Sequence, residues 1–204
     1  MELTLGTPGV HSDTGCDDRD WRKIERAAGP FNSPTDIAVA SDGQLFVSDG
    51  YGNARIHVFS AEGEVMGGWG APGDGVGEFN VPHSLVLHDD QLLYVSDREN
   101  SRVQVFTKDG RPAGVIGGIH RPDDVYPSPD GLLYVAELGY RTVQALLRPA
   151  PEGRQHSQVA ILTHDGDLLD RFGGPDPGEL GSFQAAHSMV MDSRGDLYVA
   201  DVGG

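Results

Sequence analysis

The sequence predicts an all-β fold, a β-propeller in which about three and a half blades form an open arc. Three observations predict it: similar segments recur along the chain, each complete repeat holds four strand-like runs, and the repeats follow at the spacing of propeller blades. The fourth repeat stops after two runs, at "LYVADVGG". Because a closed propeller needs at least about four complete blades, we expect these 204 residues to be an incomplete copy of a longer protein.

The repeat defines the expected organisation of the chain. Residues 1–30 form a polar leader, and residues 31–204 carry repeats at about 31–78, 79–118, 119–182 and 183–204, the last one incomplete. The opening segments match one another as "FNSPTDIAV", "FNVPHSLVL", "HRPDDVYP" and "FQAAHSMVM". The third repeat is longer because of "RPAPEGRQHSQ" at 148–158, whose Pro, Gly and polar content predicts a protruding loop.

The second repeat shows why each run is expected to be a strand. Its runs are "SLVLHD", "LLYVSD", "RVQVFT" and "PAGVIG". Apolar residues alternate with polar ones, and β-branched and aromatic residues are enriched. "AEGE" in the first repeat and "KDGR" in the second lie between the third and fourth runs, where they predict tight hairpin turns. The other repeats carry the same runs in the same order.

Composition excludes several classes of protein. Fifteen basic and 31 acidic residues give a net charge of −16, which repels phosphate backbones, so we expect no nucleic-acid partner. No run approaches the ~18 apolar residues of a membrane span. The N-terminal segment lacks a basic start followed by an apolar stretch, so we expect no membrane partner and, by default, a cytoplasmic location. The single cysteine, Cys16, excludes an intrachain disulfide.

Histidine recurs at one position of the repeat. The residue that begins the first strand of each repeat is Thr35, His83, Asp123 or His187. In a propeller that strand lines the central channel, and in a six-bladed ring alternate blades lie about 120° apart. Histidines from the second, fourth and sixth repeats would then converge on a catalytic zinc site with an open position. The third histidine would lie beyond residue 204. The alternative is that both histidines are polar strand-entry residues that bond to the backbone.

The other polar residues of the repeat favour structural roles. His57 alternates with Ile56 and Val58 and is expected to face outward, and His120 is a minor metal-ligand candidate. Asp49 and Asp97 close the "VSD" strands, where we expect them to form turns and not to act as acids.

Two segments carry a resemblance to a known family. "SDGYGNARIHVF" and "SDRENSRVQVF" resemble the NHL repeat across residues 31–204. Within that family, residues 31–106 look like the catalytic core of the peptidyl-α-hydroxyglycine α-amidating lyases. The resemblance implies a six-bladed propeller with zinc in its channel, held by three histidines, two of which match His83 and His187.

The resemblance also implies roles for three further residues. Arg55 is expected to grip the substrate carboxylate, although Arg102 occupies the same position in the next repeat and such an arginine can instead brace neighbouring turns. Tyr140, in "ELGYRTV", falls where a catalytic base is expected. Leu85 matches a position whose backbone carbonyl binds a structural calcium ion.

The implied reaction cleaves a peptidyl-α-hydroxyglycine to a peptide amide and glyoxylate at the zinc ion, with a hydroxylating oxygenase as the partner that supplies the substrate. The alternative is a non-catalytic NHL scaffold that binds a protein or small ligand. A weaker third hypothesis is a sugar-lactone hydrolase, which would use carboxylate ligands. For this chain by itself we expect little or no activity.

Overall fold

The computed structural model describes residues 3–140, 156–176 and 178–202. The chain divides into two compact parts, which are described separately: the first comprises Met1–Asn100 and Gln104–Val115, and the second comprises Ser101–Val103 and Ile116–Gly204. Most of the predicted loop at 148–158 lies outside the described residues.

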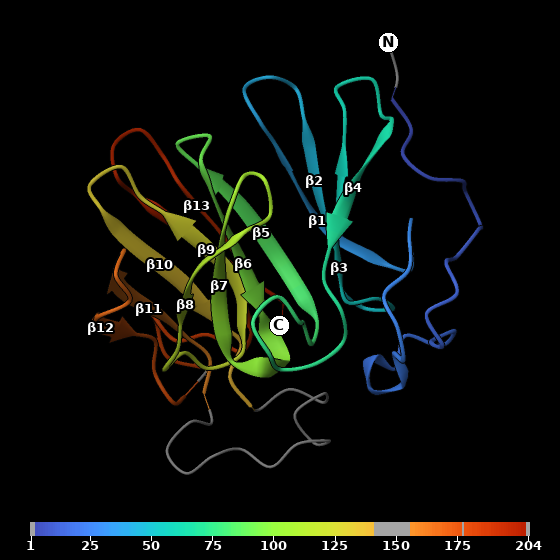
Figure 1. The fold of residues 1–204 in the computed structure, drawn as a ribbon. Helices are drawn as coiled ribbons and strands as arrows, with labels where there is room; N and C mark the ends of the chain where they lie inside the picture. The colour runs from blue at the N-terminus through green and yellow to red at the C-terminus, as the bar shows by residue number, and fades with distance from the viewer. Residues whose placement is uncertain (1–2, 141–155, 177, 203–204) are drawn as a thin grey trace. The chain divides into compact units, whose positions relative to one another are not determined.

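Every described strand lies in an antiparallel sheet whose order follows the sequence (Figure 1). Sheet 1 consists of β1 (Pro34–Val39), β2 (Leu45–Asp49), β3 (Arg55–Phe59) and β4 (Val65–Trp69). Sheet 2 consists of β5 (Pro82–His88), β6 (Leu92–Asp97), β7 (Arg102–Thr107) and β8 (Pro112–Ile116). Sheet 3 consists of β9 (Pro122–Pro127), β10 (Leu132–Glu137), β11 (Gln158–Thr163) and β12 (Leu168–Phe172). Sheet 4 is a two-stranded pair, β13 (Ala186–Met191) and β14 (Leu197–Asp201).

The predicted all-β repeat fold is therefore confirmed, with one four-stranded sheet for each complete repeat and two strands for the fourth. Such four-stranded meanders are the blades of a β-propeller. The helical content in the described residues is limited to two short 3-10 turns, Trp21–Lys23 and Arg98–Asn100. Neither is long enough to cross a bilayer, and the described chain offers no other helix that could.

The hairpin turns fall where glycine predicts them. Gly63 and Gly110 lie between the third and fourth strands of sheets 1 and 2, with φ of 87° and 81°. These values lie in the left-handed region, which glycine adopts at no steric cost. In the second of these turns the Gly110 amide donates to the Thr107 carbonyl at 2.8 Å. Turn chemistry thus fixes the register of the strands on either side.

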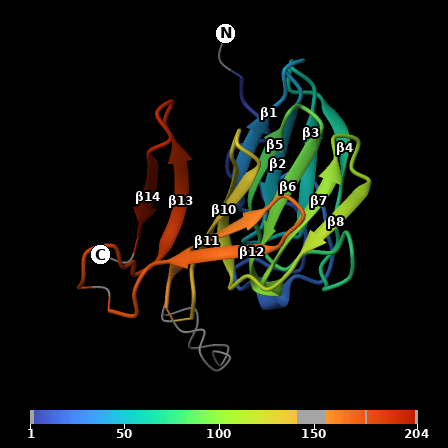
Figure 2. The ribbon, with the colours of Figure 1, turned by 90° about the vertical axis from the view of Figure 1, so that its left-hand side faces the viewer.

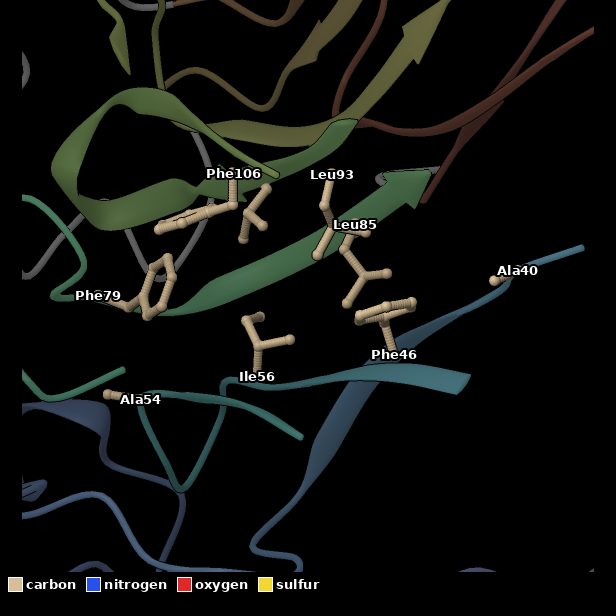
Figure 3. Close-up of a cluster of buried hydrophobic side chains, with 9 residues drawn as sticks. Ala40, Phe46, Ala54, Ile56, Phe79, Leu85, Leu93 and Phe106 are labelled. Carbon is tan, nitrogen blue, oxygen red and sulfur yellow. The ribbon is translucent and has the colours of Figure 1, made fainter. Parts of the chain in front are cut away.

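An apolar core joins sheets 1 and 2 within the first part. Figure 3 shows Phe46 and Ile56 of sheet 1 facing Leu85, Phe79 and Phe106 of the second repeat. Phe46, Ile56 and Phe106 are at most 1% exposed, so each contributes roughly 1.5–3 kcal/mol of burial free energy. The alternating pattern of the two repeats supplies these side chains, because residues two apart on a strand share a face.

The second part contains a corresponding core between sheets 3 and 4. Ala136, Val159, Ala186 and Met189 are buried together, and Tyr126, Tyr134, Phe183, Leu197 and Val199 pack against them. Figure 2 shows β13 and β14 as the two-stranded sheet 4. Both parts therefore stack one sheet against the next through the same repeat positions.

The predicted polar leader packs against the first repeat. Thr14 is fully buried and its hydroxyl donates to the Gly52 carbonyl at 2.6 Å. The Asn32 side-chain amide donates to the Cys16 carbonyl at 2.7 Å, and Cys16 is itself buried. Because buried backbone carbonyls need donors, these bonds fasten the leader to sheet 1.

Candidate functional site

A buried carboxylate ends the second strand of each complete repeat. In the first repeat the Asp49 Oδ2 atom accepts from the Asn32 amide at 2.7 Å, from the Asn53 side-chain amide at 2.8 Å and from His57 Nε2 at 3.1 Å. His57 is 2% exposed, so the prediction that it faces outward is wrong. The alternation of His57 with Ile56 and Val58 correctly indicated that its face of β3 is polar. The polar partner on that face is the buried carboxylate of Asp49, and not water.

The same arrangement recurs in the next two repeats. Asp97 accepts from the Asn80 amide at 2.7 Å, from Asn100 Nδ2 at 2.9 Å and from Gln104 Nε2 at 3.2 Å. Glu137 accepts from the His120 amide at 2.7 Å, from Gln158 Nε2 at 2.6 Å and from Arg171 Nε at 3.0 Å. These carboxylates organise turns, as predicted for Asp49 and Asp97.

His83 is held at the start of β5 by contacts to its neighbour Pro82. The Thr35 hydroxyl donates to the Pro82 carbonyl at 2.8 Å. The loop after β2 also approaches this carbonyl, because a Cβ atom on Gly50 would lie 2.3 Å from it. Only glycine fits so close to a backbone oxygen. This close approach carries the next residue, Tyr51, to the imidazole of His83.

His83, Tyr51 and Arg98 form a compact polar cluster within the first part. The Tyr51 hydroxyl lies 2.9 Å from His83 Nε2, and the two rings meet edge to face with centroids 5.5 Å apart. The Arg98 guanidinium stands 5.3 Å from the centre of the Tyr51 ring, with Nη1 3.4 Å from the Tyr51 oxygen. His83 is 6% exposed and Arg98 is 2% exposed. A buried imidazole and a buried guanidinium therefore lie against a phenol that is partly exposed to water.

The guanidinium is itself held by a carboxylate. Arg98 Nε donates to Glu99 Oε1 at 2.9 Å, and both side chains are at most 3% exposed. A buried ion pair of this kind fixes the plane of the guanidinium, because one edge is committed to the carboxylate. Arg98 is thereby oriented toward the Tyr51 hydroxyl.

His187 is paired with another strand-entry residue in the second part. Ligand atoms of Asp123 and His187 lie within 4.8 Å of each other, and Asp123 is 1% exposed. Imidazole nitrogen and carboxylate oxygen are both donors that zinc accepts in proteins. The donor chemistry of these strand-entry positions therefore fits a zinc ion.

The structure also places the other predicted residues. Arg55 Nη2 donates to the Gly68 carbonyl in sheet 1 at 3.2 Å. This contact is of the type expected if the arginine braces the neighbouring chain instead of binding a substrate. In the second part the Tyr140 hydroxyl lies 3.2 Å from Ser101 Oγ. The Arg121 guanidinium stands 5.6 Å from the centre of the Tyr140 ring. The catalytic roles of Arg55 and Tyr140 stay predictions.

Leu85, the predicted calcium ligand, is buried near an acidic group. Its amide donates to Asp36 Oδ2 at 3.1 Å. Burial raises the pKa of the Asp36 carboxyl, and the amides of Leu85 and Ile37 oppose that shift. A carboxylate and backbone carbonyls are suitable calcium donors, and the calcium site stays a prediction.

Sequence reasoning missed Tyr51 and Arg98. The signal that could have found them is the loop after the second strand, "DGYG" in the first repeat and "DREN" in the second. Tyr51 follows the buried Asp49 by two residues and Arg98 follows the buried Asp97 by one, in turns where Gly, Pro, Asn, Asp and Ser are the usual residues. Large side chains in loops that a rigid sheet positions are candidates for a binding or catalytic role.

Comparison with known proteins identifies the repeat. The NHL repeat model matches residues 31–59 and 79–106. An 86-residue stretch is 51% identical to peptidylglycine alpha-amidating monooxygenase of Rattus norvegicus, covering 39% of this chain and 9% of the relative. Over 196 residues the chain is 44% identical to peptidyl-alpha-hydroxyglycine alpha-amidating lyase 1 of Drosophila melanogaster, covering 84% of the chain and 34% of the relative.

A third relative carries no enzyme name. The chain is 33% identical over 207 residues to NHL repeat-containing protein 3 of Mus musculus, covering 98% of the chain and 52% of the relative. The chain thus spans at most about half the length of these curated relatives.

A solved structure, virginiamycin B lyase from Staphylococcus aureus, aligns with a TM-score of 0.57 at 15% identity, over 83% of this chain and 49% of that one. At this identity the likeness shows the fold alone. The chain therefore carries NHL repeats, folds into propeller-type sheets and has amidating lyases among its homologues.

Proposed function

We propose that the protein is a lyase of the amidating type, which cleaves a peptidyl-α-hydroxyglycine to a peptide amide and glyoxylate. One observation carries the proposal: the Tyr51 hydroxyl lies 2.9 Å from His83 Nε2 beneath the buried Arg98 guanidinium. This reaction needs a proton acceptor, a metal ligand and a cation that binds a carboxylate. In the proposal these are Tyr51, His83 and Arg98. The homologues named as amidating lyases support the same reaction class.

His83 and His187 are the zinc ligands in this proposal, because they occupy the same position in alternate repeats. Asp123, within 4.8 Å of His187, adds a carboxylate donor of a type that zinc accepts. When bound, zinc supplies a Lewis acid that stabilises negative charge on the substrate's α-hydroxyl oxygen.

The chain's own residues bind the substrate and move the proton. Arg98 pairs with the substrate carboxylate, for which a guanidinium offers two parallel N–H donors. The Tyr51 oxygen accepts the α-hydroxyl proton, the C–N bond breaks, and the same proton passes from Tyr51 to the amide nitrogen. Atoms balance, since the hydroxyl carbon becomes the aldehyde of glyoxylate and the nitrogen leaves as the peptide amide. Burial of Arg98 excludes water, which strengthens its pairing with the carboxylate.

Two further partners belong to this proposal. Calcium at the Leu85 backbone carbonyl would stabilise the start of β5, on which His83 stands. An oxygenase that hydroxylates peptidyl-glycine would supply the substrate. The relative named as a peptidylglycine alpha-amidating monooxygenase supports such a pairing of activities.

A non-catalytic NHL scaffold is the second candidate. The observation that favours it is the match to NHL repeat-containing protein 3, which covers 98% of this chain. In a scaffold the cluster of His83, Tyr51 and Arg98 would serve only to join β5 to the loop after β2.

Zinc content and glyoxylate release of the purified whole protein distinguish the two candidates. We expect about one zinc per chain and glyoxylate release that depends on it. His83→Ala and His187→Ala should each remove both. His11→Ala is the matched control, because His11 is exposed and should change neither. A protein that binds zinc equally well in all four forms, or releases no glyoxylate, would support the scaffold instead.

A further inference from the structure

The strand-entry residue of every repeat lies at a β-bulge. In each first strand the pairing with the second strand shifts its register at this residue. A bulge redirects a side chain, and bulges are common beside functional sites. The residues concerned are Thr35, His83, Asp123 and His187. One backbone device therefore presents all four side chains.

The four residues use this position in different ways. The Thr35 hydroxyl lies 2.8 Å from Ser48 Oγ and donates to the Pro82 carbonyl at 2.8 Å, so it joins the first repeat to the second. His83, Asp123 and His187 instead carry side chains of metal-binding types. Asp123 is only 1% exposed, and buried carboxylates in proteins are paired or coordinate a metal.

A neighbouring aspartate holds Asp123 beside His187 in the second part. Asp124 Oδ2 accepts from the Met189 amide at 2.8 Å and from the Ser188 hydroxyl at 3.3 Å. These two residues directly follow His187, so the bonds join β9 to β13 where both bulges lie. Ligand atoms of Asp123 and His187 lie within 4.8 Å of each other. Zinc bonds of about 2 Å hold two donors roughly 3–4 Å apart, which puts this pair within reach of one ion.

We propose that Asp123 is the third protein ligand of the metal centre, in the place that the family resemblance gives to a third histidine. The inference rests on the proposed function, which assigns His83 and His187 to the ion. The centre then has two imidazoles and one carboxylate instead of three imidazoles. Three protein ligands retain the open position that a catalytic centre needs.

The carboxylate has two chemical consequences. Its charge offsets one of the two positive charges of the ion, so the centre attracts a further anion less strongly than three imidazoles would allow. That leaves the substrate carboxylate to Arg98. A carboxylate also changes the preference among ions, because oxygen donors suit Mn²⁺ whereas imidazole suits Zn²⁺. We expect this centre to bind Mn²⁺ better, relative to Zn²⁺, than a centre of three imidazoles.

Competition with a chromogenic chelator measures the dissociation constants of Zn²⁺ and Mn²⁺ for the purified whole protein. Asp123→Asn should raise the zinc dissociation constant at least about tenfold, because even changes in residues that only support ligands cost about 10–100-fold. Asp123→His should restore zinc binding and raise the preference for Zn²⁺ over Mn²⁺ at least about tenfold. His187→Ala identifies the binding that belongs to this centre. Asp170→Asn is the control, because Asp170 is exposed on β12, the far edge of the same sheet.

Circular dichroism of each metal-free variant establishes that it folds. Asp123→Glu keeps the carboxylate and should keep the ion preference of wild type, so it repeats the test with a smaller change in charge. Zinc affinity that is unchanged in Asp123→Asn would overturn the inference. An ion preference that is unchanged in Asp123→His would also overturn it, because Asp123 would then only orient His187.

Glyoxylate release, assayed on the same proteins, separates this inference from the proposed function. Zinc binding that depends on Asp123 in a protein that releases no glyoxylate would support the inference and contradict the proposed function. Zinc-dependent glyoxylate release with zinc binding indifferent to Asp123 would do the reverse.

Discussion

Both compact parts place an arginine over a tyrosine ring, but the two tyrosines have different partners. Arg98 covers Tyr51, whose hydroxyl reaches His83, whereas Arg121 covers Tyr140, whose hydroxyl reaches Ser101. The guanidiniums also differ, because Arg98 donates to a carboxylate and Arg121 Nη1 donates to the Gly139 carbonyl at 2.8 Å. The repeat supplies the same scaffold twice, and the partners of the two tyrosine hydroxyls and of the two guanidiniums distinguish the copies.

The largest expected effect tests the Arg98–Glu99 ion pair at the Tyr51 site. Glu99→Ala removes the carboxylate that accepts from Arg98 Nε and leaves a buried guanidinium short of its counter-charge. We expect the free energy of unfolding to fall by about 3–5 kcal/mol, measured by urea titration. Arg194→Ala is the control: its partner Asp196 is exposed, so the expected change is below about 1 kcal/mol. A loss for Glu99→Ala no larger than the control would mean that Arg98 is positioned by other contacts.

The next effect separates the two tyrosines by activity. Tyr51→Phe should reduce glyoxylate release by the whole protein by about 10²-fold or more, because it removes the proposed base. Tyr140→Phe should change the rate less than about threefold, since its hydroxyl lies against a serine. Equal losses in the two variants would remove the distinction between the parts, and a loss confined to Tyr140→Phe would restore the assignment made from sequence.

A sequence can predict the parts of this fold that each strand encodes by itself. Alternating residues and turn glycines such as Gly63 and Gly110 determine strands and hairpins locally, so the four sheets follow from pattern. The strand-entry positions of His83 and His187 are likewise visible, because the repeat aligns them.

Contacts between loops of different repeats could not be predicted in this way. Tyr51 reaches His83 only because Gly50 allows the loop after β2 to approach Pro82, and no pattern encodes that approach. His57 was misjudged for a related reason: its partner Asp49 lies on a neighbouring strand. Tyr140 and Arg55 were chosen from the family resemblance, and their catalytic roles stay predictions.

A smaller effect concerns the buried carboxylates at the ends of the second strands. Asp49 accepts from the amides of Asn32 and Asn53, whereas Glu137 also accepts from the Arg171 guanidinium. Arg171→Ala should therefore lower the free energy of unfolding by about 2 kcal/mol, the worth of a hydrogen bond to a charged group. Arg111→Ala removes an exposed pair with Asp109 and should change it by less than about 0.5 kcal/mol. Similar values for both variants would show that the second part does not depend on this bond.

The smallest expected effect is a difference in pH dependence between the parts. Burial raises the pKa of Asp36 in the first part, whereas the Arg194 amide lowers the pKa of Asp192 in the second. A carboxyl whose pKa is raised by folding stabilises the protein below its unfolded pKa, and that contribution is lost as pH rises through the folded value. A carboxyl whose pKa is lowered contributes above its unfolded pKa, and that contribution is lost as pH falls through the folded value.

The two asparagine variants should therefore show opposite trends when urea unfolding is measured at about pH 3 and about pH 7. For Asp36→Asn, the stability of the variant relative to wild type should increase as pH rises, because wild type alone must ionise a buried group. For Asp192→Asn, the relative stability should decrease as pH rises, because wild type alone gains a bonded carboxylate. Asparagine retains one oxygen, which can accept from the amide of Leu85 or Arg194. In Asp36→Asn an NH2 group replaces the oxygen that accepts from Ile37, and because that loss is the same at both pH values, the trend with pH reports the charge. Parallel trends would mean that burial in the first part does not outweigh the amide bonds to Asp36.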